Sequence, residues 1–256
     1  SNQAAMDYAR GRAWSDETIE CARLGFSGFA TAAEFKEMRE TLKANNIDPE
    51  SPAAVAIMGF KGDVAKLKDK WGREFEIKDA IGNDDINNGF IPGFMGRTRL
   101  IYPHLYFQKI TYLSSRNLVK TEDGKLISDP GKQKSFNPRR ELVGERQPYF
   151  GWNYKAEGLA HVVIVEGQAD AITLAQWGFN VVGINGVTLD DYWSKELCER
   201  HATRYCALDN DETGRKVIYG KNGEFPIADQ LGPLAQIVQW AKKDANDIRQ
   251  WCVRRG

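Results

Sequence analysis

The sequence is poor in residues that bind zinc and has no long apolar run. It holds 4 cysteines and 3 histidines in 256 residues, with no CxxC pair and no Cys/His spacing of the zinc type. We therefore expect reduced structural thiols and no zinc in this chain. No stretch approaches the ~18 apolar residues of a membrane-spanning helix, and no leader-like segment precedes Met6. A GxxxxGK[ST] phosphate loop is also missing, so these residues encode no P-loop motor.

Charge is balanced over the whole chain but not along it. Lys+Arg and Asp+Glu both number 35. Between Arg97 and Arg146 basic residues outnumber acidic ones by 11 to 5, whereas from Glu157 to the end acids outnumber bases by 14 to 11. A basic stretch beside an acidic one suits a track for a polyanion that leads to a metal site. Ordinary charge scatter is the alternative that counting leaves open.

The apolar pattern changes near residue 158. Before it, "SDETIECARLGF" indicates a helix capped by Ser15, and "ATAAEFKEMRETLKANN" indicates a second helix. Residues 97–118 are aromatic and β-branched, which predicts strands, and "KTEDGKLISDPGKQKSFNPRR" has the composition of a loop. We therefore expect a mixed α+β subdomain over residues 1–158.

From about residue 160, apolar strands alternate with helices. The expected strands are "HVVIVEG", "NVVGING", "RYCALDND" and "AQIVQWA", and the first two helices are "ADAITLAQWG" and "LDDYWSKELCERH". This order predicts a parallel sheet flanked by helices, in a second subdomain over residues 159–256. The fold class is therefore α/β.

Acidic residues follow three of the expected strands. Glu166 follows the first, Asp209 and Asp211 close the third, and Asp244 and Asp247 follow the fourth. Because ligands gather at the carboxyl ends of parallel strands, we expect these carboxylates to meet at one edge. Clustered carboxylates repel one another, so a positive charge should lie among them. Hard oxygen ligands of this kind suit Mg²⁺ or Mn²⁺.

Each acid taken alone also has a structural interpretation. Asp209 or Asp211 suits the N-cap of a helix that begins near "ETGRK". Asp170 suits the cap of the helix that follows Gly167, and Asp244 and Asp247 suit a solvated turn. Their recurrence at successive strand ends favours a shared metal site.

Two of these strand ends resemble a known domain. "VEGQAD" followed by "ALDNDETG" resembles the Toprim domain, whose signature is Glu-Gly-x-x-Asp at one strand end and Asp-x-Asp at a later one. "KDAND" is similar to the matching acidic loop of phage and mitochondrial primase-helicases. Topoisomerases, small ribonucleases and recombination proteins share this domain, so the Toprim resemblance alone leaves the function open.

The first half resembles the RNA polymerase core of bacterial and phage-type DNA primases. "YARGRAWSDETIECARLGF" looks like the stretch that opens this core, and "GRTRLIYPHL" looks like its Arg-x-Arg-hydrophobic-hydrophobic-Phe-Pro strand, with Tyr102 in place of Phe. "ITYLSSRNL" matches a Gly-Phe-Gly-Gly-Arg strand only at its arginine, and "KQKSFNP" resembles Lys-Tyr-x-Asn-Ser-Pro. The motifs arrive in primase order, and residues 45–92 match none of them.

The resemblance implies a role for each matching residue. The catalytic residues would be Glu166, Asp209 and Asp211, and the metal ligands would be these three with Asp170 and Asp244. The second acid of the third motif is either replaced by Asn246 or shifted to Asp247. The template and nucleotide track would be lined by Arg97, Arg99, Arg116, Lys134 and Asn137.

Three aromatic residues follow the two arginines of the same strand. Tyr102, His104 and Tyr106 would offer aromatic faces to single-stranded DNA, and burial in the core is the alternative for the tyrosines.

The implied activity is that of a nucleotidyltransferase, a DNA primase that makes short RNA primers on single-stranded DNA with about two Mg²⁺ or Mn²⁺ ions. Nucleoside triphosphates, a single-stranded DNA template and a replicative helicase are the implied partners, with no membrane. The implied compartment is the cytoplasm of a bacterial or phage-infected cell, or an organellar matrix. A Toprim-type metal-dependent nuclease and a non-catalytic nucleic-acid-binding protein remain the alternatives.

Overall fold

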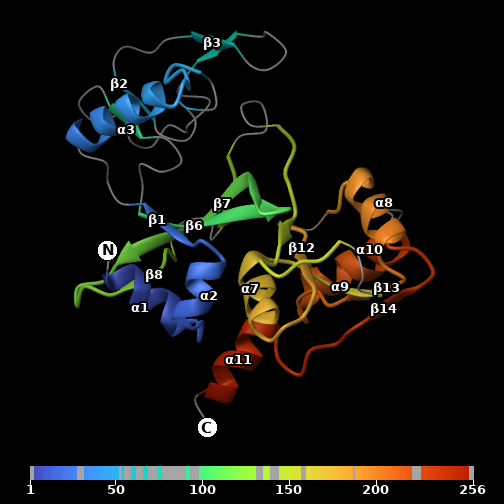
Figure 1. Ribbon diagram of the computed structural model, residues 1–256. Helices are drawn as coiled ribbons and strands as arrows, with labels where there is room; N and C mark the ends of the chain where they lie inside the picture. The colour runs from blue at the N-terminus through green and yellow to red at the C-terminus, as the bar shows by residue number, and fades with distance from the viewer. Residues whose placement is uncertain are drawn as a thin grey trace. The chain divides into compact units, whose positions relative to one another are not determined.

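The computed structural model describes residues 3–27, 32–51, 54, 59–61, 66–68, 74–76, 90–92, 98–130, 135–138, 144–156, 160–186, 188–220 and 226–253 (Figure 1). The chain forms two compact units. Unit 1 comprises Ser1–Ala5, Gly25–Tyr102 and Tyr112–Arg146, and unit 2 comprises Met6–Leu24, Pro103–Thr111 and Gln147–Gly256. The subdomain boundary between residues 158 and 159 stays a prediction.

Unit 1 is built on a sheet of order β1-β6-β7-β8, with β9 also paired to β7. Its strands are β1 (Gly25–Ser27), β6 (Arg99–Tyr106), β7 (Lys109–Lys120), β8 (Leu126–Ser128) and β9 (Ser135–Phe136). Residues 103–111 of β6 and β7 are grouped with unit 2. The strands predicted over residues 97–118 are confirmed for the described part. The segment expected to be a loop contains the strands β8 and β9, so that expectation is wrong in part. β8 forms because the alternation of "LIS" lets Leu126 be buried beside β7.

Among the described residues, unit 1 also contains the helix α3 and two strand pairs. The helix predicted from "ATAAEF" onward is confirmed as α3 (Ala32–Ala44). The strand pairs are β2 (Gly59–Lys61) with β5 (Phe90–Pro92), and β3 (Lys66–Lys68) with β4 (Glu74–Glu76), both antiparallel.

Unit 2 contains the predicted parallel sheet, in the order β10-β12-β11-β13-β14. Its strands are β10 (Tyr149–Phe150), β12 (Val181–Gly183), β11 (His161–Val165), β13 (Thr203–Cys206) and β14 (Ala235–Ile237). The four predicted strands pair in parallel, and β10 adds an antiparallel edge that the sequence pattern did not indicate. Ile164 pairs with Cys206, which in turn pairs with Ile237, so the strands end at one edge.

The structure also describes the helices α1 (Gln3–Gly11), α2 (Asp16–Cys21), α7 (Gln168–Gln176), α8 (Asp191–Arg200), α9 (Glu212–Tyr219), α10 (Ile227–Gln230) and α11 (Ala245–Val253). The predicted cap of α2 is confirmed, because the Ser15 hydroxyl accepts the Thr18 backbone N–H at 3.1 Å. Within the described residues, no helix is long and apolar enough to cross a bilayer.

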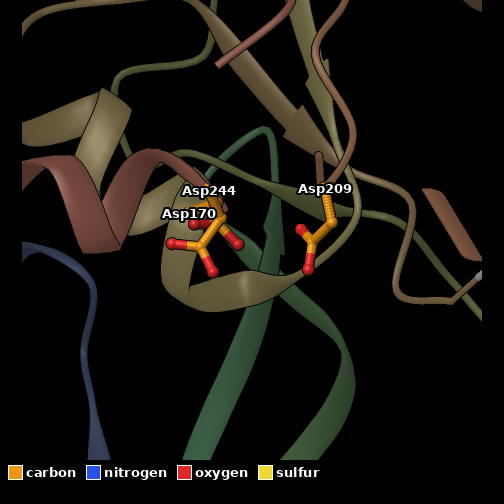
Figure 2. Close-up of side chains that lie close together, drawn as sticks. All are labelled: Asp170, Asp209 and Asp244. Carbon is orange, nitrogen blue, oxygen red and sulfur yellow. The ribbon is translucent and has the colours of Figure 1, made fainter. Parts of the chain in front are cut away.

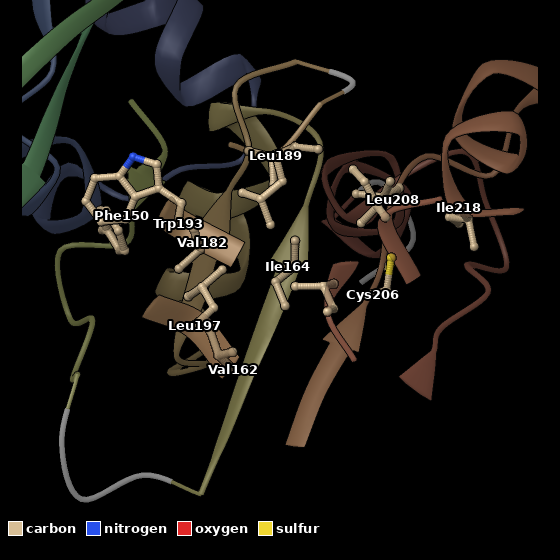
Figure 3. Packing of buried hydrophobic residues seen from close by; sticks show 13 residues of the cluster. Phe150, Val162, Ile164, Val182, Leu189, Trp193, Leu197, Cys206, Leu208 and Ile218 are labelled. Atoms are coloured by element: carbon tan, nitrogen blue, oxygen red, sulfur yellow. The ribbon is translucent and has the colours of Figure 1, made fainter. Parts of the chain in front are cut away.

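One face of the parallel sheet packs on α8, α9 and α10. Figure 3 shows this core, in which the strand residues Ile164 and Val182 lie with Trp193 and Leu197 of α8. Because side chains alternate along a strand, Val163 and Val165 point to the opposite face, where α7 packs against β11 and β12 and α11 packs against α7. The first turns of α7 and α11 therefore belong to the same side of the sheet.

The approach of α7 to the sheet depends on a glycine. A Cβ at Gly183 would lie 2.9 Å from the carbonyl oxygen of Gly167, the residue before α7. The missing side chain lets α7 begin directly over the strand ends.

Candidate metal centre

Three aspartates meet where the parallel strands end. Asp170 lies in the first turn of α7, Asp209 follows β13, and Asp244 precedes α11. One carboxylate oxygen of each lies within 4.8 Å of the others, and Figure 2 shows the three groups turned toward one another. The predicted meeting of carboxylates at one edge is therefore confirmed for Asp209 and Asp244, and Asp170, which only the Toprim resemblance added, joins them.

Backbone donors at the start of α11 hold two of these acids. Asp170 Oδ1 accepts the N–H of Asn246 at 3.0 Å, and Asp244 Oδ1 accepts the N–H of Asp247 at 2.7 Å. Amide groups at a helix N-terminus stabilise negative charge. The helix thus fixes the positions of both carboxylates without neutralising them.

The electrostatics of the cluster disfavour full ionisation. Burial, followed by the charges of Asp244 and Asp209, raises the pKa of Asp170 well above its usual value. Burial also raises the pKa of Asp209, against the opposing effect of Lys243. Buried carboxylates that raise one another's pKa bind a divalent cation readily, since the cation removes both the repulsion and the cost of burial. The oxygen donor set fits a hard divalent ion.

Glu166 lies directly after β11, beside this group. Burial, then the charges of Asp209 and Asp211, raises its pKa to about 7. Among the described residues, no hydrogen bond to the Glu166 carboxylate is found. A carboxyl group with this pKa exchanges a proton near neutral pH.

Asp211 has a different environment from the other acids. Its Oδ1 accepts the N–H of Gly214 at 2.9 Å, which makes it the N-cap of α9. That bond, aided by Lys243, lowers the pKa of Asp211 below its usual value. The capping interpretation therefore holds for Asp211. Its other oxygen, Oδ2, contacts Lys243, which also contacts Asp209.

The sequence favoured a metal ion as the positive charge among the acids, and the structure places the ammonium group of Lys243 there. Its Nζ lies 3.1 Å from Asp209 Oδ2 and 3.5 Å from Asp211 Oδ2. Burial alone would lower its pKa, but the hydrogen bonds and charges of these two aspartates outweigh burial and raise it. The sequence signal was present in "KKDAND", where a lysine directly precedes the third acidic motif.

Asn246 occupies the position where the resemblance expected a second acid. Its side chain is 2% exposed and donates to Thr173 Oγ1 and to the carbonyl of Arg12, both at 3.0 Å. Its Oδ1 accepts from Arg12 at 2.9 Å and from Gln250 at 2.6 Å. Asn246 thus ties the segment before α2 to α7 and α11, and its amide group does not join the acids. The shifted candidate, Asp247, has an exposed side chain.

Restoring the family's acid at this position should damage the protein. Asn246→Asp removes both amide donors and buries a carboxylate, so we expect the free energy of unfolding to fall by about 2–3 kcal/mol. Urea denaturation measures this, with Asp247→Asn as the exposed control, which should stay within about 0.5 kcal/mol of the parent. A gain in metal affinity without loss of stability would contradict the structural role of Asn246.

The residues predicted to line the nucleic-acid track lie in unit 1 or outside the described residues. Arg97 and Lys134 are not among the described residues. Arg99 is 3% exposed in β6, Arg116 donates to Ser128 Oγ at 3.1 Å, and Asn137 is half-buried. Their assignment to a track stays a prediction.

The aromatic residues after Arg99 do not form a stacking surface. Tyr102 is 1% and His104 0% exposed. His104 Nδ1 lies 2.8 Å from the Pro148 carbonyl, and burial lowers the pKa of His104 to about 4. Tyr106 is half-buried and donates to Glu196 at 2.8 Å. The core alternative therefore holds for Tyr102, and the expected stacking on His104 is wrong, because β6 is buried on both faces up to Leu105.

Comparison with known proteins gives one family and a set of solved structures. Residues 163–248 match the Toprim-like family, and no curated protein matches the chain by sequence. The Aquifex aeolicus primase structure, with zinc-binding and RNA polymerase domains, has a TM-score of 0.62 and 17% identity over 100% of this chain and 55% of that one. The chain thus spans little more than half of the Aquifex chain.

Two further structures contain nucleic acid. The RNA polymerase domain of Mycobacterium tuberculosis primase DnaG, in complex with a double-stranded DNA oligomer with a 6-nucleotide overhang, has a TM-score of 0.62 and 17% identity over 97% of this chain and 69% of that one. A DnaG primase catalytic domain bound to single-stranded DNA has a TM-score of 0.55 and 18% identity, covering 98% and 69%. Both resemblances seen in the sequence are confirmed in the fold: residues 163–248 form a Toprim-like segment of a chain with the α/β fold of bacterial primase RNA polymerase domains.

Proposed function

We propose that this chain is the polymerase core of a DNA primase, a nucleotidyltransferase that makes short RNA primers on single-stranded DNA. The observation that carries the proposal is the meeting of Asp170, Asp209 and Asp244 at the carboxyl edge of a Toprim-like sheet. A fold shared with primase polymerase domains over nearly the whole chain supports it.

The acidic residues would hold the metal and move the proton. Asp170, Asp209 and Asp244 would bind Mg²⁺ or Mn²⁺, with Glu166 and Asp211 completing a site for about two ions. Bound ions of this kind stabilise the charge on the entering and leaving oxygens of phosphoryl transfer. Glu166, whose pKa is about 7 while the site holds no ion, would instead accept the proton of the attacking 3′-hydroxyl if it stays outside the coordination sphere of the ions.

Three basic residues and one asparagine of unit 1 would bind the substrates. Arg116 and Asn137, with Arg97 and Lys134, would contact phosphates of the template and of the nucleoside triphosphate. Arg99 could contribute only if its buried guanidinium became accessible. A replicative helicase would supply the single-stranded template.

A Toprim nuclease is the second candidate, since it would use the same acids to cut phosphodiester bonds. The match to primase cores beyond the Toprim-like segment favours synthesis over cleavage. Retention of Glu166, Asp209 and Asp211 argues against a merely binding role, because binding alone needs no such cluster.

The test is primer synthesis without a pre-existing primer. The chain is incubated with single-stranded DNA, labelled ribonucleoside triphosphates and Mg²⁺ or Mn²⁺, beside Asp209→Asn and the exposed control Asp229→Asn. We expect short labelled RNA from the parent and from Asp229→Asn, and a loss of at least about 100-fold in Asp209→Asn, since the variant removes a charge that acts on the transition state.

Other outcomes separate the candidates. Degradation of the DNA without synthesis, lost in Asp209→Asn, would establish the nuclease. Synthesis at the parent rate by Asp209→Asn would show that the aspartate cluster is not the reaction centre.

A further inference from the structure

Asp209 borders two places where a cation could bind, and these two places differ in charge. On one side, Asp209 meets Asp170 and Asp244, and their carboxylate oxygens lie within 4.8 Å of one another. On the other side, Asp209 and Asp211 share the ammonium group of Lys243, at 3.1 and 3.5 Å. One position is bounded only by carboxylates, whereas the other already contains a positive charge.

Lys243 is held at this position by its backbone. Its carbonyl accepts the N–H of Asn210, the residue between the two aspartates, at 2.6 Å. Asn210 Nδ2 donates to the Trp240 carbonyl at 3.0 Å, and Trp240 Nε1 donates to the Ala207 carbonyl at 2.9 Å. These bonds join the loop after β14 to the loop after β13. The lysine stem therefore begins directly beside Asp209 and Asp211.

The ammonium group is displaceable although its backbone is fixed. The Lys243 side chain is 47% exposed, whereas that of Asp209 is 13% exposed. A lysine is a compact charge on a flexible four-carbon stem, so it can leave a carboxylate at modest cost when another cation arrives. A divalent ion between Asp209 and Asp211 would have to displace it or bear its repulsion.

We infer that Lys243 is an internal counter-cation that competes with a divalent ion for Asp209 and Asp211, so that the free protein binds one such ion tightly and a second weakly. The inference rests on the proposed metal-dependent function of this site. Lys243 acts on the ligands rather than on the reacting atoms, which makes it a positioning residue.

The experiment counts Mn²⁺ bound to the full chain without substrate, by calorimetry and by the electron paramagnetic resonance signal of free Mn²⁺. Lys243→Met keeps the stem and removes the charge. We expect the second Mn²⁺ to bind about tenfold more tightly in this variant, the effect of one charge contact in a partly exposed site. Lys243→Arg keeps the charge and should leave the second ion weak.

The matched control is Lys242→Met. Lys242 is the neighbouring lysine, and its Nζ lies 5.5 Å from the centre of the Trp251 ring, where the structure places it in a cation–π contact. We expect its removal to leave both Mn²⁺ affinities unchanged, because any effect of net charge alone would appear in both variants. A stability measurement in chelator confirms that each variant is folded.

Two results would overturn the inference. Either Lys243→Met binds Mn²⁺ with the parent's number and affinities, or Lys242→Met shifts the second affinity equally. Binding is measured without nucleotides, so its outcome is independent of polymerisation. A chain that makes no primers but shows the Lys243-specific shift would refute the polymerase proposal and keep the competition. A chain that makes primers without this shift would refute the competition alone.

Discussion

Replacing Gly214 with alanine is expected to lower primer synthesis by about 100-fold or more, because even a 1 Å misplacement of a reacting group costs about that factor. Gly214 is buried in the first turn of α9, and its N–H donates to the Asp211 carboxylate that caps this helix. An alanine Cβ there would overlap the carbonyl oxygen of Asp209 and lie 2.9 Å from its carbonyl carbon and 3.2 Å from its nitrogen. Backbone atoms cannot rotate away, so either Asp209 or α9 has to move.

The same substitution should also lower the free energy of unfolding by about 2–3 kcal/mol, the usual cost of overpacking a rigid site. Urea denaturation and the primer assay measure the two effects on one preparation. Gly11→Ala is the matched control, since a Cβ at Gly11 meets nothing within 4 Å. It should leave synthesis unchanged and stability equal or slightly higher. Parent-like synthesis and Mn²⁺ affinity in Gly214→Ala would show that Asp209 does not depend on this close approach.

The pattern of the sequence was sufficient for the Toprim-like part because its central strands, β11 and β12, are buried on both faces. The apolar run "VVIV" and the mixed strand "RYCAL" are both followed by polar residues, and parallel pairing then brings those ends to one edge. Asp209 and Asp244 could be placed together on this basis, whereas Asp170 was expected there only from the Toprim resemblance. The sequence pattern did not predict β10, because a strand of two residues, Tyr149 and Phe150, is too short to show an alternating pattern.

Other features depend on tertiary contacts that no local pattern records. The alternation around His104 suggested an exposed aromatic face, but neighbouring elements bury both sides of β6. The resemblance expected an acid at the position of Asn246. Hydrogen bonds with Arg12, Thr173 and Gln250 explain why an asparagine side chain is found there instead. Repulsion among the acids predicted a cation, which the sequence favoured as a metal ion, whereas the presence of Lys243 depends on the joining of two loops.

Glu166→Gln is expected to stabilise the metal-free protein at pH 8 while lowering synthesis by about 100-fold or more, the usual contribution of a general base. The pKa of Glu166 is about 7 in the folded protein, against 4.5 for an unperturbed glutamate. The folded state therefore binds more protons than the unfolded state between these values, and stability falls as the pH rises through them. Above pH 7 the penalty is complete, at about 2 kcal/mol once solvent access to the side chain is allowed for.

Glu166 and its neighbour Asp211 should change the stability of the protein with pH in opposite directions. The folded pKa of Asp211 is lowered, so its charge stabilises the protein above the unfolded pKa, and the stabilisation is lost as the pH falls through the folded pKa. Urea denaturation in chelator at pH 4 and pH 8 should therefore show Glu166→Gln equal to the parent at pH 4 and more stable at pH 8. Asp211→Asn should be less stable than the parent at pH 8.

Mg²⁺ should stabilise the parent more than Glu166→Gln, because the ion relieves the repulsion that the substitution has already removed. Equal pH profiles for the parent and Glu166→Gln would mean that Glu166 is ionised at no cost, and its part as the proton acceptor would lose its physical basis.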